Sequence, residues 1–166
     1  MLINPMLILP GATALSPFRH AALVQTLRAF APNLEALQVE YRYFVAEAAP
    51  LTAARRTVLA DLLEAGDTNP LTSEQAGSGH VYRLYIIPRP GTISPWSSKA
   101  SEIALCCGLS EVERIERGIA YALTAKAALA TSSLERVAAH LHDRMTEVVI
   151  HDLREAAALF RHAEPR

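Results

Sequence analysis

Apolar positions along the chain predict four strands alternating with four helices. Strands are indicated by short apolar runs and by period-two alternation rich in β-branched and aromatic residues. The expected strands are Met6 to Leu9, Val39 to Val45, Val81 to Ile87, and Val112 to Leu123 with a possible break at Gly118. The first run is followed by Pro10-Gly11, which is typical of a turn.

The expected helices are marked by capping signals. A serine before a proline suits the N-cap and first helical position. The predicted helices run from Ser16-Pro17 to about Phe30, from Thr52 to Gly66, from Ser94-Pro95 to Gly108, and onward from the capping box Ser132-Ser133-Leu134-Glu135. Their apolar faces carry Leu23, Leu27 and Phe30, then Leu59, Leu62 and Leu63, and in the last helix Leu134, Val137, Leu141 and Met145.

Two segments carry weaker signals. Residues 67–79 consist of turn-forming residues and predict a loop. The stretch from Thr146 to Ile150 has the composition of a strand. Its apolar phase, however, continues that of the preceding helix through Met145, Val149 and Leu153 to Phe160. We expect helix there.

The order strand-helix-strand-helix occurs twice, and the sequence supports a duplication. The stretch from Pro10-Gly11 to Ser16-Pro17-Phe18 resembles Pro90-Gly91 to Ser94-Pro95-Trp96, with two residues fewer in the second copy. This predicts an α+β fold, one antiparallel sheet covered by helices, with pseudo-repeats at about 6–66 and 85–145. We expect a single domain over residues 1–163, with 164–166 starting a linker.

Composition and charge narrow the functional classes. The chain of 166 residues is 51% hydrophobic and 20% charged with a net charge of −1, which favours a packed core and gives no electrostatic basis for nucleic-acid binding. No apolar run is long enough for a signal peptide or a membrane span, so we expect a cytoplasmic protein without membrane contact. The adjacent Cys106 and Cys107 cannot form a disulfide framework, and we expect buried thiols.

The segment from Arg89 to Lys99 carries the largest number of groups that could bind a ligand. A helix N-terminus offers free N–H groups, and nearby serines and cations could hold a phosphate or a carboxylate. The candidates for substrate or interdomain contact are Arg89, Ser94, Trp96, Ser97, Ser98 and Lys99. The alternative is a rigid turn and N-cap with Trp96 in the core. The first copy has no Ser-Ser-Lys after its Ser-Pro, so one end of the duplicated fold would face a ligand or partner.

A second polar stretch lies from Leu141 to Glu147. His142, Asp143 and Arg144 are secondary candidates for an interface, on what we expect to be a helical surface. The spacing of His140 and His142 does not suit a shared metal, and we expect no metal site. We find no nucleophile elbow, phosphate-binding glycine loop or acid/base pair, and predict no catalytic residues.

Several of these motifs together resemble a known family. The segment from Arg89 to Ala100, then Cys107-Gly108-Leu109, Arg114 to Gly118 and Leu141 to Met145, are similar to the N-terminal domain of the large, single-chain phosphoribosylformylglycinamidine synthase, also called formylglycinamide ribonucleotide amidotransferase. The likeness spans about residues 6 to 162. Two pairs in the third helix depart from the family: Leu105-Cys106 stand where His-Asn is expected, and Ser101-Glu102 where Thr-Asp is usual.

The resemblance implies a role in purine biosynthesis. The whole enzyme makes an amidine from formylglycinamide ribonucleotide with ATP, Mg²⁺ and glutamine, and its synthetase and glutaminase regions follow this domain. The domain resembles a fused dimer of the small subunit of multi-chain versions. We therefore expect a non-catalytic assembly domain that binds no cofactor itself and packs on the synthetase. The alternatives are a free-standing anion-binding α+β module and, less favoured, an independent enzyme.

Overall fold

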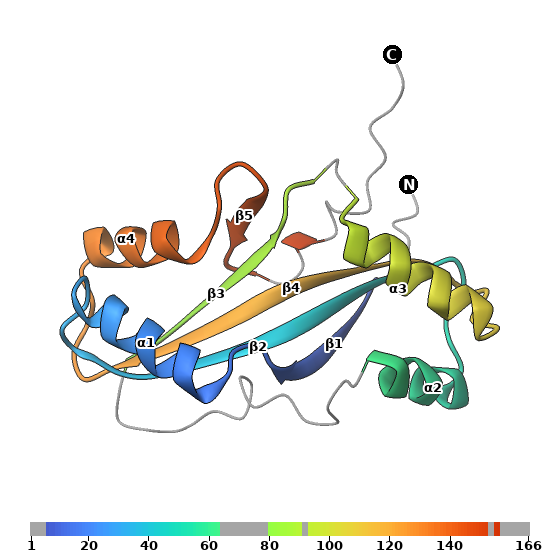
Figure 1. The fold of residues 1–166 in the computed structure, drawn as a ribbon, viewed down its shortest axis with the longest axis horizontal. Coiled ribbons are helices and arrows are strands. Elements are labelled where there is room, and N and C mark those ends of the chain that lie inside the picture. The colour runs from blue at the N-terminus through green and yellow to red at the C-terminus, as the bar shows by residue number, and fades with distance from the viewer. Residues whose placement is uncertain (1–5, 64–79, 91–92, 153–154, 157–166) are drawn as a thin grey trace, which may run out of the picture.

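The structure, a computed structural model, describes residues 6–63, 80–90, 93–152 and 155–156. Within them, strands and helices follow one another along the chain as expected (Figure 1). The elements are β1 (Met6–Thr13), α1 (Pro17–Arg28), β2 (Leu34–Glu47), α2 (Ala53–Leu63), β3 (His80–Pro88), α3 (Pro95–Cys106), β4 (Val112–Ala125), α4 (Thr131–Leu141) and β5 (Glu147–Ile150).

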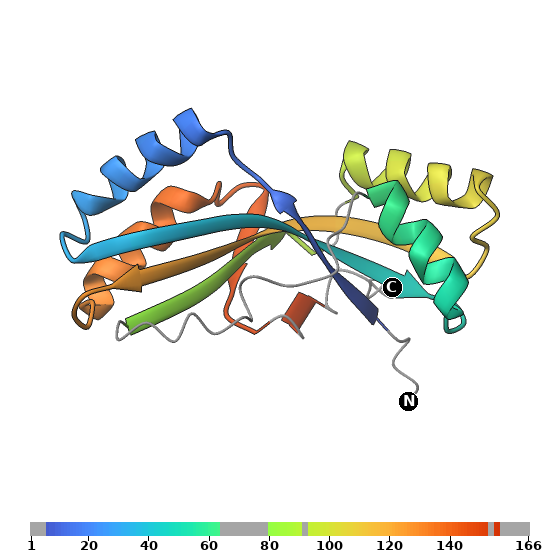
Figure 2. The same cartoon turned by 90° about the horizontal axis from the view of Figure 1, so that it is seen from below.

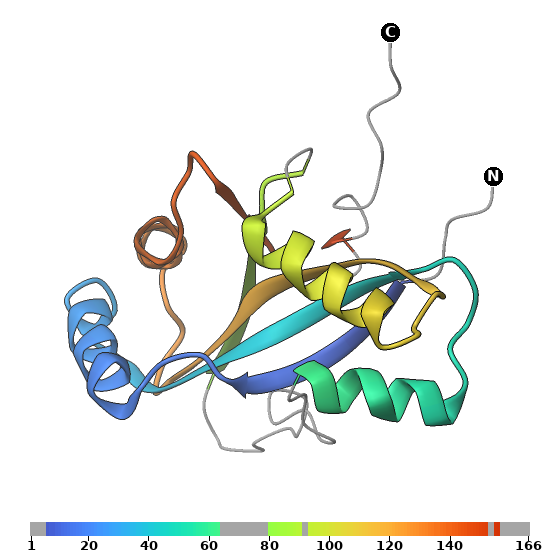
Figure 3. The same cartoon turned by 45° about the vertical axis from the view of Figure 1, so that its right-hand side comes forward.

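The strands form one antiparallel sheet in the order β1-β2-β4-β3-β5. The two longest strands, β2 and β4, pair at its centre. Helices α1 and α4 lie over one end of the sheet, and α2 and α3 lie over the other end (Figures 1 and 3). The predicted α+β fold with a single helix-covered antiparallel sheet is confirmed.

The core divides by sheet face and by end. Because side chains of a strand alternate between faces, odd-numbered residues of β2 and β4 face the helices. Leu27 of α1 and Val137 of α4 pack with Leu123 in one cluster, and Leu59 of α2 packs with Ile115 in a second. The opposite face has its own cluster of Phe44, Tyr85, Ile87, Ala120, Ala122, Ile150 and Ala156.

The two halves are related by an internal pseudo-two-fold axis. β2 and β4 each have 14 residues, and their first residues, Leu34 and Val112, are 78 positions apart (112 − 34). Ser16 and Ser94 are 78 apart as well, and each is the N-cap of its helix with a proline at the start. The strand order β1-β2-β4-β3 reads the same from either half. The duplicated pattern is therefore consistent with the structure (Figure 2).

The Pro-Gly pairs are not equivalent, which corrects the sequence alignment. Met6 pairs with Ala46, and Val81 pairs with Thr124, the counterpart of Ala46 (46 + 78). The outer strands are thus offset by 75 (81 − 6), and the second half has three residues more between strand and helix, not two fewer. Pro90 follows the end of β3.

Pro10-Gly11 is not a turn but part of β1. Pro10 pairs with Arg42, and a proline is tolerated there because β1 is the edge strand of the sheet. A Cβ at Gly11 would lie 2.7–2.9 Å from atoms of Tyr41 and Tyr43, so close packing explains the glycine. Pro-Gly was misread as a turn because the pair can occur either at the end of a strand or within an edge strand, and the sequence alone does not distinguish the two cases.

Gly118 does not interrupt β4, which is continuous from Val112 to Ala125. A Cβ at Gly118 would lie 2.8 Å from the backbone oxygen of Ile86 and 3.0 Å from the ring of Phe44. The glycine therefore allows β3 and Phe44 to approach the strand closely. Gly108, which was expected to end α3, has a φ of +83° and does so.

The C-terminal part differs most from the prediction. α4 begins at Thr131, and its N-cap Ala130 makes no side-chain hydrogen bond, so the predicted capping box does not form. The chain leaves the helix at His142, and residues 147–150 form β5 on the free edge of β3 instead of continuing the helix. Met145, expected inside, is 82% exposed. Pairing the edge of β3 with Val148, Val149 and Ile150 outweighs the helical apolar phase.

The two thiols are also placed differently from expectation. Cys106 and Cys107 are both exposed, because they lie at the C-terminal end of α3, where Ala104 and Leu109 supply the buried contacts. The predicted loop at 67–79, the expected helix end at Gly66, the later apolar positions Leu153 and Phe160, and the linker at 164–166 lie outside the described residues.

Candidate functional site

The first turn of α3 is held by its own N-cap and by a buried carboxylate. The Ser94 hydroxyl accepts a hydrogen bond from the Ser97 backbone N–H at 3.0 Å. The same hydroxyl donates to Glu116 Oε1 at 3.3 Å, and Glu116 is 0% exposed. Glu116 forms an ion pair with Arg114. An anion of the chain itself therefore lies beside this turn, which is where the sequence predicted a bound phosphate or carboxylate.

Two serines of α3 complete the backbone hydrogen bonding of β4. β3 pairs with β4 only from Ile119 onward, which leaves the edge of β4 open at Ile115. The Ser97 hydroxyl donates to the Ile115 carbonyl at 2.5 Å, and the Ser101 hydroxyl accepts from the Ile115 N–H at 3.0 Å. Ser97 is 0% exposed. These hydroxyls replace the missing strand, since a buried backbone group without a partner is costly.

The indole of Trp96 lies in an aromatic cluster on the helix-covered face of the sheet. It stacks on the ring of Tyr43 with 5.8 Å between centroids and an interplanar angle of 20°. The guanidinium carbon of Arg117 lies 4.7 Å from the centroid of Trp96 and 4.5 Å from that of Tyr41. Arg117 is directly opposite Tyr43 in the β2–β4 ladder. We call these four residues the Trp96–Arg117 cluster.

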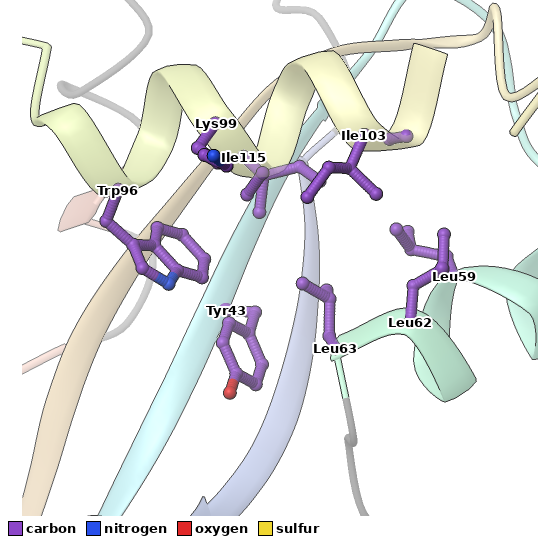
Figure 4. Close-up of a pocket in the computed structure, with 10 residues that line it drawn as sticks. Tyr43, Leu59, Leu62, Leu63, Trp96, Lys99, Ile103 and Ile115 are labelled. Atoms are coloured by element: carbon purple, nitrogen blue, oxygen red, sulfur yellow. The ribbon is translucent and has the colours of Figure 1, made fainter. Parts of the chain in front are cut away.

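A groove of about 220 Å³ opens between α2 and α3 beside this cluster (Figure 4). Trp96 lies at one end and Leu62 of α2 at the other, with Tyr43 and Leu63 between them. The remaining lining residues are Leu59, Lys99, Ala100, Ile103, Ala104 and Ile115. Among the described residues that line the groove, Lys99 is the one with a formal charge, so this lining is apolar with a cationic rim.

Arg89 lies away from this groove, beside the turn that follows α4. Its guanidinium Nη2 donates to the carbonyl of Arg144 at 2.6 Å, and its backbone N–H donates to the carbonyl of Thr146 at 2.8 Å. In the same turn, Asp143 accepts from the Met145 N–H at 2.8 Å. His142 Nδ1 donates to the Ala138 carbonyl at 2.5 Å. These residues form a compact turn, which replaces the helical surface predicted for them.

Residues 40–160 match the family model described as formylglycinamide ribonucleotide amidotransferase N-terminal. The match covers well over half of the chain. The chain belongs to this family. It is thus related to the N-terminal domain of an amidotransferase of purine biosynthesis, as the motifs at Arg89–Ala100 and Arg114–Gly118 indicated.

The candidate residues of this amidotransferase domain separate into several environments. Trp96 and Lys99 line the α2–α3 groove. Ser98 lies in a separate depression with Glu113 and Arg114. Arg89 shares a shallow surface with His142 and Arg144, so the structure brings together one primary candidate and two secondary ones. Ser94 and Ser97 make the structural contacts described above.

Sequence reasoning missed Arg117 as a site residue. Its signal was present, because Arg117 lies in the family motif Arg114 to Gly118, but only the sheet register shows that it meets Tyr41 and Trp96. Among the residues that the structure describes, no three His, Cys, Asp or Glu side chains gather as a metal site. None of the described helices combines the length and hydropathy needed to cross a membrane.

Proposed function

We propose that this chain is the N-terminal assembly domain of formylglycinamide ribonucleotide amidotransferase (phosphoribosylformylglycinamidine synthase). In this role it would support the ATP- and glutamine-dependent formation of the amidine without carrying out a chemical step. The observation that carries the proposal is the family match over residues 40–160, on a chain whose sheet is built from two related halves.

The contacts made by the polar groups of α3 and of the adjacent part of β4 support a non-catalytic role. Ser94 caps α3, Ser97 and Ser101 hold the edge of β4, and Glu116 is buried and paired. A catalytic nucleophile or general acid must reach a substrate, and these groups are engaged with the protein's own backbone and side chains. Activity of the complete enzyme would then depend on its other domains for ATP, Mg²⁺ and glutamine.

The two ends of the sheet suggest how the domain would pack on the synthetase. The end of the sheet under α2 and α3 carries the Trp96–Arg117 cluster, Lys99 and the α2–α3 groove, and both halves of the chain contribute residues to it. Aromatic residues and arginine are enriched in protein interfaces, and an apolar groove with a cationic rim provides contact area with orientation. The partner would be the synthetase region of the same enzyme. Two exposed, unbridged cysteines fit a reducing cytoplasm.

The test is turnover by the purified chain. We expect neither glutamine hydrolysis nor ATP consumption, with added Mg²⁺ and formylglycinamide ribonucleotide, at a level above that of a heat-denatured sample. The complete enzyme serves as the positive control in the same assays. Steady-state turnover that disappears on substitution of a residue of this chain would contradict the proposal and favour an independent enzyme.

A further inference from the structure

The side chain of Arg117 lies among aromatic rings on the helix-covered face of the sheet. Its guanidinium lies over the rings of both Tyr41 and Trp96, and Trp96 is itself stacked on Tyr43. Contacts between a cation and aromatic ring faces hold the planar group in place while its N–H donors point outward in the plane. The cluster therefore fixes the orientation of a five-donor group before any ligand arrives.

The charge of Arg117 is not neutralised within the described part of the chain. No hydrogen bond or ion pair among the described residues involves its side chain. The neighbouring Glu116 points to the opposite face of β4 and is paired with Arg114. Arg117 is half-buried, so its charge is partly removed from water, and no counter-ion comes from the residues that the structure describes. This is the arrangement in which a bound anion gains most from a guanidinium.

The duplication provides an internal comparison for this cluster. The counterpart of Arg117 in the first half is Val39 (117 − 78), and the counterpart of Trp96 is Phe18 (96 − 78). Val39 is an ordinary core residue, and Phe18 is 84% exposed. The same strand-helix-strand unit thus forms without the cluster. The strand-helix-strand unit therefore does not need an arginine and a tryptophan at these two positions in order to form, which favours a binding role for them.

We propose that Arg117 is an oxyanion-binding residue, which takes a carboxylate or a phosphate group by a two-point hydrogen bond from its guanidinium. This goes beyond the assembly role, because it assigns a ligand chemistry to one residue and does not depend on which domain lies nearby. The oxyanion can come from an acidic side chain of another domain or from a free phosphate ester. The adjoining groove at Lys99 then receives an apolar part of the same partner.

Trp96 makes the proposal measurable on the purified chain, because it is the one tryptophan of the sequence. Its fluorescence is recorded during titration with sodium phosphate and with sodium glutarate, against sodium chloride at equal ionic strength. We expect a saturable change with the two oxyanions that exceeds the change with chloride. The Arg117→Lys variant should weaken the response at least about tenfold, because lysine lacks the planar fork.

Two comparisons keep this test decisive. Arg136→Lys changes an exposed arginine of α4, at the other end of the sheet, and should leave the titration unaltered. Thermal unfolding of each variant shows that it is folded. Equal responses to oxyanions and chloride would overturn the proposal, and so would a titration unaffected by Arg117→Lys in a folded variant. Both results concern this chain alone and leave the assembly role untouched.

The source of the oxyanion is distinguished by chemical modification of arginine. Phenylglyoxal labelling of Arg117, read by peptide mass spectrometry, is compared in the purified chain and the complete enzyme, with and without inorganic phosphate. Protection in the complete enzyme before phosphate is added indicates a carboxylate from another domain. Protection that appears only with phosphate indicates a free ligand. Labelling that is equal in all four samples would contradict the proposal.

Discussion

Tyr41 of β2 lies directly opposite Ile119 of β4, and the two residues occupy the same position in the two halves of the chain. They are 78 positions apart (119 − 41), which is also the offset between β2 and β4. A residue that faces its own counterpart marks the pseudo-two-fold axis, which therefore passes between Tyr41 and Ile119. The Trp96–Arg117 cluster lies beside this axis, where the two halves meet, with Tyr41 and Tyr43 from the first half and Trp96 and Arg117 from the second.

The symmetry extends to a backbone group that both halves must satisfy. Leu37 and Ile115 are counterparts (115 − 37 = 78), and each carbonyl points away from the central β2–β4 pair. His20 Nε2 of α1 donates to the Leu37 carbonyl at 2.6 Å, and the Ser97 hydroxyl of α3 donates to the Ile115 carbonyl at 2.5 Å. Two different side chains thus meet one requirement of the fold.

We predict that Ser97→Ala destabilises the protein by about 1–3 kcal/mol, because it leaves the buried Ile115 carbonyl without its donor. Ser98→Ala is the matched control, since Ser98 is the exposed neighbour on the same helix turn, and it should change stability by less than about 0.5 kcal/mol. Urea unfolding of the two variants measures this. Equal stabilities would show that Ser97 does not hold the edge of β4.

A second prediction compares counterpart aromatic residues. Trp96→Ala should cost about 3 kcal/mol, because it removes the ring stacked on Tyr43 and leaves a cavity beside α3. Phe18→Ala at the equivalent, exposed position should stay within about 0.5 kcal/mol. Equilibrium unfolding followed by circular dichroism suits both variants. Similar losses of stability at the two positions would contradict the prediction, because they would show that Phe18 is packed as tightly as Trp96.

Strands and helices were predicted correctly where the local sequence pattern and the packing of the whole fold favour the same secondary structure. The Ser-Pro pairs at positions 16 and 94 do cap helices, and the strand over residues 81–87 forms as expected. Disagreements arose at sheet edges. Pro10 lies in a strand because β1 has a free edge, and Val148 to Ile150 form a strand because β3 offers one. Edge pairing depends on strands distant in sequence, which local periodicity does not register.

The candidate site was predictable in part for the same reason. Trp96 and Lys99 share a groove as their proximity on one helix suggests. Arg117 meets Trp96 only through the β2–β4 register, and Ser97 meets Ile115 only because β3 is short. The segment from Arg89 to Lys99 gave the correct residues for a family motif. The sequence did not show which of its serine hydroxyls form hydrogen bonds within the protein and are therefore not available to a ligand.

The pH dependence of stability should reveal Tyr121. Burial raises the pKa of Tyr121 to about 12, with smaller contributions from the charges of Glu147 and Tyr41. The unfolded tyrosine ionises near pH 10, so above that pH the unfolded state binds fewer protons than the folded state, and stability falls until pH 12. At pH 11 the loss due to this group is about 1.4 kcal/mol.

Urea unfolding at pH 9 and pH 11, for the parent protein and for Tyr121→Phe, measures that contribution. The Phe variant should lose less stability between the two pH values than the parent protein does. Tyr82, whose hydroxyl accepts from the Leu129 N–H at 2.9 Å, provides a control variant, Tyr82→Phe, at another tyrosine. An identical pH slope for parent and Tyr121→Phe would show that Tyr121 ionises at an ordinary pKa.

We predict that Lys99→Ala and Arg89→Ala lower amidine synthesis by the complete enzyme while sparing glutamine hydrolysis assayed alone. Both side chains are exposed, so each change should alter stability by about 1 kcal/mol or less, with the Arg89 contact to the Arg144 carbonyl lost. Lys126→Ala, an exposed lysine just beyond β4 at the other end of the sheet, is the control. Full synthesis by both folded variants would exclude the two cations from the docking or substrate surface.

The central claim, that the domain supports synthesis without catalysing it, is tested most directly by removal and addition. Amidine synthesis and glutamine hydrolysis are measured for the complete enzyme, for the enzyme without this domain, and for the latter after the purified chain is added back. We expect removal of the domain to lower the rate of amidine synthesis at least about a hundredfold, while glutamine hydrolysis persists. Adding the purified chain back should restore part of the synthesis, and adding the Arg117→Glu variant should not. Unchanged synthesis after removal of the domain would contradict the account.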